Sequence, residues 1–271
     1  MIIKTFRYIL MAAVVVAIAV GCKGKKAKVA ESIELSKEET FESLANYPIP
    51  TSFDILQLIN KAGAGYIVSM CNSTENIGQY LTEKQKAMNL GIYGADLAYS
   101  TVYQMTQEVM NYLNVSKKLI EDLNINIGFN RELAQDVERN INNKDSLINI
   151  ITNSYFDTYK YLNNSGRDNL SLMVLAGSWI EGLFITSEIA YTSANNADFL
   201  SILASQKASL SVLMELIDNH KADNADLAEL SNLLAPVSEV FASVADDANT
   251  LTAEQFKQLS EAVSKARNAM V

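Results

Sequence analysis

The sequence predicts an all-α protein, a single array or bundle of about ten antiparallel helices. Three observations support this fold class. The chain of 271 residues contains only three prolines, Pro48, Pro50 and Pro236. No stretch alternates Val, Ile and Thr with polar residues, which is the pattern of a half-buried strand. Three segments carry the Ser/Thr-x-x-Glu/Gln pattern that caps the start of a helix, and they are residues 36–39, 82–85 and 252–255.

Prolines and glycines set the limits of the first helices. Pro48 and Pro50 require an extended link, and Gly63 and Gly65 end the helix that follows this link. The cap at Thr82 opens the longest predicted helix. The predicted helices of this half cover residues 36–46, 52–62, 82–113, 115–124, 130–142 and 143–164.

The second half is predicted from the same signals. Asp168 can cap an apolar helix whose centre is residues 172–185. Pro236 should bend or break the helix that contains it, because proline removes a backbone donor. The remaining predicted helices cover residues 197–219, 225–248 and 252–268.

The first 35 residues differ in composition from the rest of the chain. Lys4 and Arg7 precede an apolar run from Ile9 to Val20, which is typical of a secretory signal peptide. A membrane-spanning helix, the alternative interpretation, requires about 20 apolar residues, and this run is shorter. We therefore expect a signal peptide, a lipidated flexible basic tether and an all-helical body, at residues 1–21, 22–35 and 36–271.

The segment from Ile18 to Cys22 resembles the bacterial lipobox, in which the cysteine is lipidated and becomes the first residue of the mature protein. The resemblance implies a lipid anchor on Cys22, a membrane as partner and a place in the cell envelope. Surface-exported lipoproteins of Bacteroides-type bacteria carry an acidic tag after this cysteine. Lysines follow Cys22 instead, which favours the outer membrane facing the periplasm.

Charge restricts the partners of the body. From Val29 onwards the chain has 16 basic and 31 acidic residues, a formal charge of about −15. Phosphate binding requires clustered Lys and Arg, so nucleic acid is not expected as a ligand. If Cys22 is acylated, Cys71 has no partner for an internal disulfide, and we expect it to be buried and inert.

The two most apolar helices, residues 82–113 and the one that begins at Asp168, are predicted to be central. Gly91 and Gly94 each cost about 1 kcal/mol relative to alanine inside a helix. We therefore expect close approach by another helix or a ligand. A shift of 86 positions places Gly91 on Gly177, which suggests two similar helical units packed face to face. The alternative is a chance match between two apolar helices.

Four segments resemble uncharacterised all-helical lipoproteins of Bacteroides-type bacteria. The resemblance covers roughly Tyr47 to Asn195 and implies the envelope address and the helical fold, but no activity. The segments are residues 47–51, 89–99, 142–147 and 175–183.

Six side chains form the candidate ligand site. Asp96 and Glu181 are acids within apolar stretches, where an unpaired carboxylate is costly to bury. Aromatic residues on the same helices could complete an acidic and aromatic pocket for a small molecule or peptide. In the alternative interpretation, the acids accept hydrogen bonds and only fix helix register. The six candidates are Tyr93, Asp96, Tyr99, Tyr103, Trp179 and Glu181.

No pattern in the sequence indicates a reaction. There is no phosphate-binding loop, nucleophile elbow or zinc spacing, and a single histidine, His220, cannot supply the Glu-x-x-His pairs of a di-metal bundle. We expect no catalytic residue, metal or cofactor. The first hypothesis is therefore a membrane-anchored, non-catalytic interaction or scaffold protein, and the second is a small-molecule or peptide binder.

Overall fold

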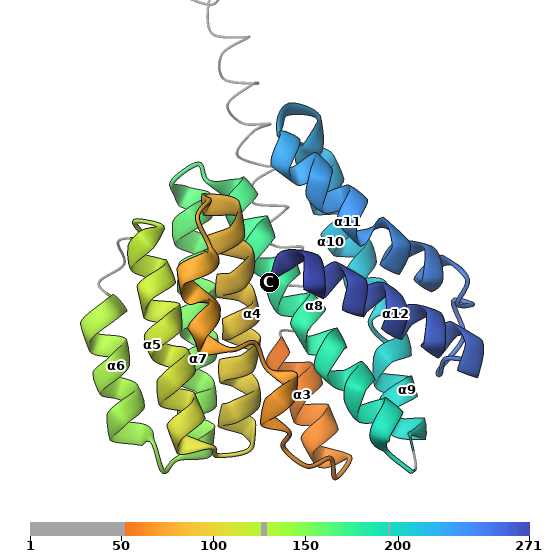
Figure 1. Cartoon of the computed structure of the whole chain (residues 1–271), viewed down its shortest axis with the longest axis horizontal. Helices are drawn as coiled ribbons and strands as arrows, with labels where there is room; N and C mark the ends of the chain where they lie inside the picture. The colour runs from red at the N-terminus through yellow and green to blue at the C-terminus, as the bar shows by residue number, and fades with distance from the viewer. Residues whose placement is uncertain (1–51, 126–128, 195) are drawn as a thin grey trace, which may run out of the picture. The chain divides into compact units, whose positions relative to one another are not determined.

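A computed structural model of the chain describes residues 52–125, 129–194 and 196–271. Within these ranges the protein is all-α, with ten α-helices, three short 3-10 helices and no strand, so the predicted fold class is confirmed (Figure 1). The α-helices are α3 (Ser52–Lys61), α4 (Glu83–Val102), α5 (Thr106–Asp122), α6 (Phe129–Asn140), α7 (Lys144–Asn164), α8 (Asp168–Thr192), α9 (Ala197–Ala204), α10 (Lys207–His220), α11 (Ala225–Ala242) and α12 (Ala253–Met270).

Several predictions concern residues outside the described ranges. The signal peptide, Cys22, the tether, the helix at residues 36–46 and the link at Pro48 and Pro50 all lie there. They remain predictions.

The central position of α4 and α8 is confirmed. These two helices make the most extensive helix–helix contact of the described fold, and 15 of the 20 residues of α4 and 19 of the 25 residues of α8 are buried. The contact is close at two glycines. A Cβ atom at Gly91 would lie 2.0 Å from the carbonyl oxygen of Val174, and one at Gly177 would lie 2.1 Å from that of Met88. The expected close approach at Gly91 is therefore made by α8.

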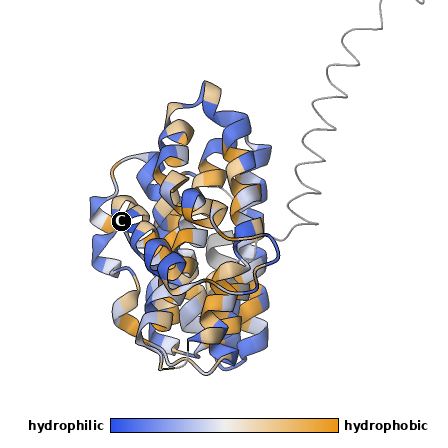
Figure 2. Cartoon of the chain, turned by 90° about the vertical axis from the view of Figure 1, so that its right-hand side faces the viewer, coloured by the Kyte–Doolittle hydropathy of each residue, from blue (hydrophilic) through white to orange (hydrophobic). Residues whose placement is uncertain are grey.

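The other helices cover these two. On one side α5 and α7 contact α4, and α6 packs on α7; on the other side α9, α10, α11 and α12 contact α8, while α3 contacts both central helices (Figure 1). Apolar residues concentrate inside this arrangement and hydrophilic residues outside it (Figure 2). Asp168–Thr192 and Ala197–Asp223 are long and apolar enough to span a membrane, but the first is 89% buried within the fold, as a core helix would be.

Several predicted boundaries are wrong. The helix predicted at residues 82–113 is two helices, because the chain turns at residues 103–105 with Gln104 at φ 57°. The predicted break between residues 113 and 115 is absent, because α5 continues through it. The segment 197–219 divides into α9 and α10 around Gln206. The helix α11 continues through Pro236 without a break and ends at Ala242, before the predicted end at residue 248. Among the described helices the longest is consequently α8, with 25 residues.

The helix caps were predicted more accurately. Thr82 with Gln85 and Thr252 with Gln255 both form complete capping boxes. Asp168 is the first residue of α8 rather than its cap, and Arg167 stands at the cap position without a side-chain hydrogen bond.

A segment that the sequence did not predict connects α3 with α4. Residues 64–73, here called the strap, lie along α4 and include the 3-10 helix Val68–Met70; the 3-10 helix Thr74–Gln79 follows. The strap brings backbone polar groups against the central helices, and several candidate residues form hydrogen bonds with these groups.

Candidate functional site

Four of the six candidate residues hold the strap on α4. They recur every three or four residues, so they share one face of the helix. Tyr93 Oη donates to the Ser73 carbonyl at 2.7 Å. Asp96 Oδ2 accepts from the Asn72 backbone N–H at 3.0 Å.

The other two candidates contact the beginning of the strap. Tyr99 Oη donates to the Gly65 carbonyl at 3.2 Å and accepts from the Ile67 backbone N–H at 3.0 Å. Tyr103 Oη donates to the Ala64 carbonyl at 2.9 Å. The strap therefore runs antiparallel to α4, and the predicted ligand-binding face of α4 is occupied by the protein's own backbone.

Glu181 pairs with an arginine that the sequence reasoning missed. Arg267 of α12 donates from Nε to Glu181 Oε2 at 2.7 Å and from Nη2 to Oε1 at 3.0 Å. The same Nη2 donates to the Met70 carbonyl of the strap at 3.3 Å. The guanidinium also stacks 4.3 Å from the ring centre of Phe184, a favourable cation–π contact.

One signal could have found Arg267. Residues Phe256, Leu259, Val263 and Met270 recur at helical spacing and are buried. Arg267 lies on this apolar stripe, and an arginine at such a position requires a buried partner. The apolar spacing of α12 does not identify which acid in the chain pairs with Arg267.

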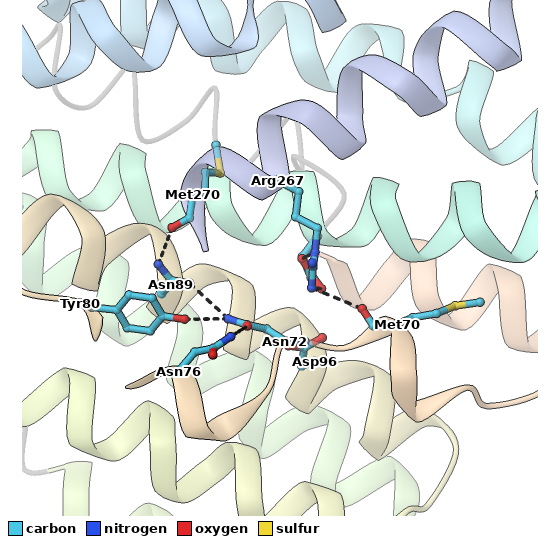
Figure 3. A network of polar contacts seen from close by, with 9 residues as sticks. Met70, Asn72, Asn76, Tyr80, Asn89, Asp96, Arg267 and Met270 are labelled. Carbon is cyan, nitrogen blue, oxygen red and sulfur yellow. Dashed lines mark hydrogen bonds and ion pairs between the residues drawn. The ribbon is translucent and has the colours of Figure 1, made fainter. Parts of the chain in front are cut away.

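The junction of α4, α8, α12 and the strap is completed by asparagines (Figure 3). Asn72 donates from Nδ2 to Tyr80 Oη at 2.9 Å and to Asn89 Oδ1 at 3.3 Å. Asn89 in turn donates to the carbonyl of Met270 at 2.7 Å. The last turn of α12 is thereby tied to both α4 and the strap.

The two candidate acids are fully buried, each with 0% of its surface exposed. Burial and the nearby charge of Glu181 raise the pKa of the Asp96 carboxyl well above its ordinary value. Burial also raises the pKa of Glu181, against the opposing effect of Arg267. The Asp96 Oδ1 atom receives no hydrogen bond from any described residue.

Cys71, a residue of the strap, lies beside Asp96 of α4. Its thiol is only partly buried, not fully buried as expected. Burial and the charges of Asp96 and Glu181 raise the pKa of this thiol, which disfavours the thiolate and keeps the sulfur unreactive.

Trp179 does not join the other candidates. Its side chain is 1% exposed, and its ring lies 6.4 Å from that of Phe241 on α11. Its indole N–H has no hydrogen-bond partner within the described ranges. The structure thus brings Tyr93, Asp96, Tyr99, Tyr103 and Glu181 to the strap or its junction, and leaves Trp179 in the α8–α11 contact.

A cavity lies between α4, α5, α6 and α7, with one wall residue each from α3 and α8, and is here called the four-helix cavity. Its volume is about 90 Å³, and none of the six candidates lines it. Its wall is mostly apolar, with Leu90, Leu97, Leu113, Ile120, Ile151 and Val174.

One polar atom of this wall is unsatisfied. Ser116 of α5 is 7% exposed, and its Oγ has no hydrogen-bond partner among the residues described. On the same wall, Thr158 Oγ1 donates to Ser154 O, and Tyr155 Oη donates to Val174 O. Asn114 is exposed and Lys117 is partly exposed, so both lie where the cavity meets the surface.

A larger groove of about 530 Å³ lies between α4, α8, α11 and the end of α12. Lys84 on its rim already pairs with Glu229 at 2.6 Å. In the described part of the chain, no three His, Cys, Asp or Glu side chains gather as a metal site requires. Comparison of this chain with protein-family models, curated proteins and solved structures finds no match.

Proposed function

We propose that this protein is a non-catalytic binding protein of the cell envelope, anchored through a lipid on Cys22, whose body takes a small and largely apolar ligand in the four-helix cavity. The binding site differs from the one expected between the central helices. The observation that carries the proposal is that Ser116, a residue of the cavity wall, has a buried hydroxyl without a hydrogen-bond partner among the described residues.

An unpaired buried hydroxyl costs about 1–3 kcal/mol. A water molecule needs two to four polar partners to stay in a cavity, and this wall is mainly apolar. A ligand with an apolar body and one hydrogen-bonding atom would bury its carbon atoms against the leucines and isoleucines. It would also satisfy Ser116 Oγ.

Size narrows the ligand further. An apolar cavity of about 150 Å³ accommodates benzene, and this cavity is smaller, at about 90 Å³. The ligand class that fits is a short alkyl chain with a hydroxyl, amide or carboxyl group. Such a chain can be a free molecule or the end of a longer amphiphile whose remainder leaves past Asn114 and Lys117.

The test measures how much each linear alcohol from ethanol to hexanol stabilises the protein, in comparison with the alkane of equal length. Wild-type protein should be stabilised most by one intermediate alcohol, with a weaker effect of the matched alkane. Ser116→Ala should abolish the preference for alcohol over alkane. Gly94→Ala should weaken binding, because its new methyl would lie 3.7 Å from the Tyr155 ring, inside the same cavity.

Ser187→Ala is the matched control. Ser187 Oγ is also buried without a partner in the described structure, but this residue does not line the cavity. An equal preference for alcohol over alkane in wild type and Ser116→Ala would refute the role of Ser116, and no binding by any member of the series would refute ligand binding in this cavity.

The lipid anchor is tested separately. Mass spectrometry of protein from its native membrane should find an N-terminal acylated Cys22. An intact Met1 or an unmodified Cys22 thiol would refute the anchor, and with it the proposed place at the periplasmic face of the outer membrane.

The interaction or scaffold role is a second proposal for the same body. It is supported by two large apolar side chains at the surface, Leu81 and Tyr191, which are 81% and 70% exposed. Crosslinking from either position in intact cells should capture one recurrent protein partner. Crosslinks to many unrelated proteins would contradict a specific interaction.

A further inference from the structure

The junction of α4, α8, α12 and the strap holds more negative than positive groups. Asp96 and Glu181 are fully buried carboxyls, and Arg267 is the guanidinium that contacts Glu181. Arg267 binds the Met70 carbonyl and Asp96 binds the Asn72 N–H, so both charged side chains meet the same three-residue stretch of the strap (Figure 3).

The hydrogen bonds are distributed unequally between the two acids. Both oxygens of Glu181 accept from Arg267, which is the bidentate geometry that stabilises a carboxylate. Asp96 accepts one hydrogen bond at Oδ2 and none at Oδ1 from any described residue. A buried carboxylate with one bare oxygen is costly, whereas a carboxylic acid can use that oxygen as a donor.

The remaining titratable groups around Asp96 bring no second positive charge. Cys71 faces it from the strap, Tyr112 from α5, and Tyr93 is on its own helix. Burial raises the pKa of each of these three groups, so each is neutral at ordinary pH. The Asp96 carboxyl lies near enough to Glu181 for each of the two acids to influence the protonation of the other.

We propose that Asp96 Oδ1 carries a proton that it shares with Glu181. This proton stabilises the contact of the strap and α12 with the central helices, and its release at higher pH weakens that contact. With the proton, the two acids and Arg267 form a neutral set. Without it, one negative charge stands uncompensated in the interior. Loss of the proton should therefore loosen the strap and the end of α12 together.

The direction of the pH effect follows from linkage. The folded-state pKa of Asp96 lies above the value of about 3.9 for an unfolded chain. Between these two values the folded protein holds a proton that the unfolded chain has released. The stabilisation is complete below about pH 4 and is lost as the pH rises through the folded-state pKa.

The experiment compares urea unfolding of the full chain from pH 5 to pH 9 for wild type and Asp96→Asn. Asparagine imitates the protonated acid but cannot ionise. The wild-type unfolding constant should rise relative to that of Asp96→Asn by about tenfold per pH unit until the proton is lost. The chain has one histidine, so few other groups titrate in this range. His220→Gln and the exposed Asp246→Asn should keep the wild-type slope.

Infrared spectroscopy of folded wild type gives a readout that does not depend on unfolding. At pH 6 it should show the carbonyl band of a buried carboxylic acid, which disappears in Asp96→Asn and remains in Asp246→Asn. Hydrogen exchange should show that amides of residues 64–73 and the last turn of α12 open more at pH 9 than at pH 6, after correction for intrinsic rates. Absence of the band, or parallel pH profiles of wild type and Asp96→Asn, would overturn the proposal.

Discussion

Gly91 of α4 and Gly177 of α8 each lie against the backbone of the other helix. The missing side chains allow the Val174 and Met88 carbonyls to occupy positions 2.0 Å and 2.1 Å from where a Cβ would stand. The contact is reciprocal, and the two glycines are 86 positions apart in the sequence. The following helices are not equivalent, because α5 has 17 residues and α9 has 8.

Gly91→Ala should destabilise the protein by about 3 kcal/mol or more. The new methyl would overlap a backbone carbonyl, so α4 and α8 would have to separate, and overpacking of this kind typically costs 1–3 kcal/mol and sometimes more. Gly94→Ala is the control on the same helix. Its methyl would meet only the Tyr155 ring at 3.7 Å, and higher helix propensity should make it neutral or up to about 1 kcal/mol stabilising. Urea denaturation measures both, and similar losses would contradict the close approach.

Replacing only one member of the Glu181–Arg267 pair should be severe. Glu181→Leu or Arg267→Met leaves a buried charge without its partner, for which about 3–5 kcal/mol is expected. The double variant should be more stable than the sum of the two single losses implies. Chemical denaturation of wild type, the two single variants and the double variant measures the coupling energy between Glu181 and Arg267.

The surface pair of Lys84 and Glu229 is the comparison for this cycle. Its two side chains are partly exposed and lie 2.6 Å apart. Glu229→Gln should change stability by less than about 1 kcal/mol. Additive losses at Glu181 and Arg267 would show that the buried pair does not act as a unit.

The tyrosines of α4 should contribute to stability through the strap. Tyr99→Phe removes two hydrogen bonds to strap backbone, and Tyr103→Phe removes one. At about 0.5–1.5 kcal/mol per bond, the first variant should lose roughly twice as much stability as the second. Hydrogen exchange should rise first at residues 64–67. The exposed Tyr191→Phe should change neither quantity, and unchanged exchange in Tyr99→Phe would contradict the assigned role.

Ser116→Ala should separate stability from binding. Without ligand, removal of an unsatisfied buried hydroxyl should stabilise the protein by up to about 1 kcal/mol. In the presence of the best-bound alcohol this gain should disappear, because wild type alone can hydrogen-bond the ligand. Thermal melts with and without alcohol measure both effects. A loss of stability in the ligand-free variant would mean that the hydroxyl already has a partner.

The sequence located the candidate residues better than it identified their roles. Asp96 and Glu181 could be recognised because a carboxylate in an apolar helix must be buried and compensated. The compensating groups came from elsewhere, namely a backbone N–H at Asn72 and a guanidinium at Arg267. Helical spacing marks Arg267 as buried but does not pair it with Glu181, which is 86 residues away, and no spacing links Asn72 to Asp96.

The four-helix cavity was not predicted at all. It is lined by residues from six helices, and Ser116 looks like any serine on an amphipathic helix. Its hydroxyl is unusual because the packing of the helices buries it without a partner among the described residues.

By itself the sequence determined the all-α fold, two capping boxes, the central place of α4 and α8, and a close approach at Gly91. These features depend on local hydrogen bonding and on the spacing of apolar residues and glycines, which a single segment contains. Only the tertiary structure decided the turn at Gln104, the course of the strap, the partner of Glu181 and the position of the cavity. Each of these depends on polar and apolar groups distant in sequence that become neighbours only when the helices pack.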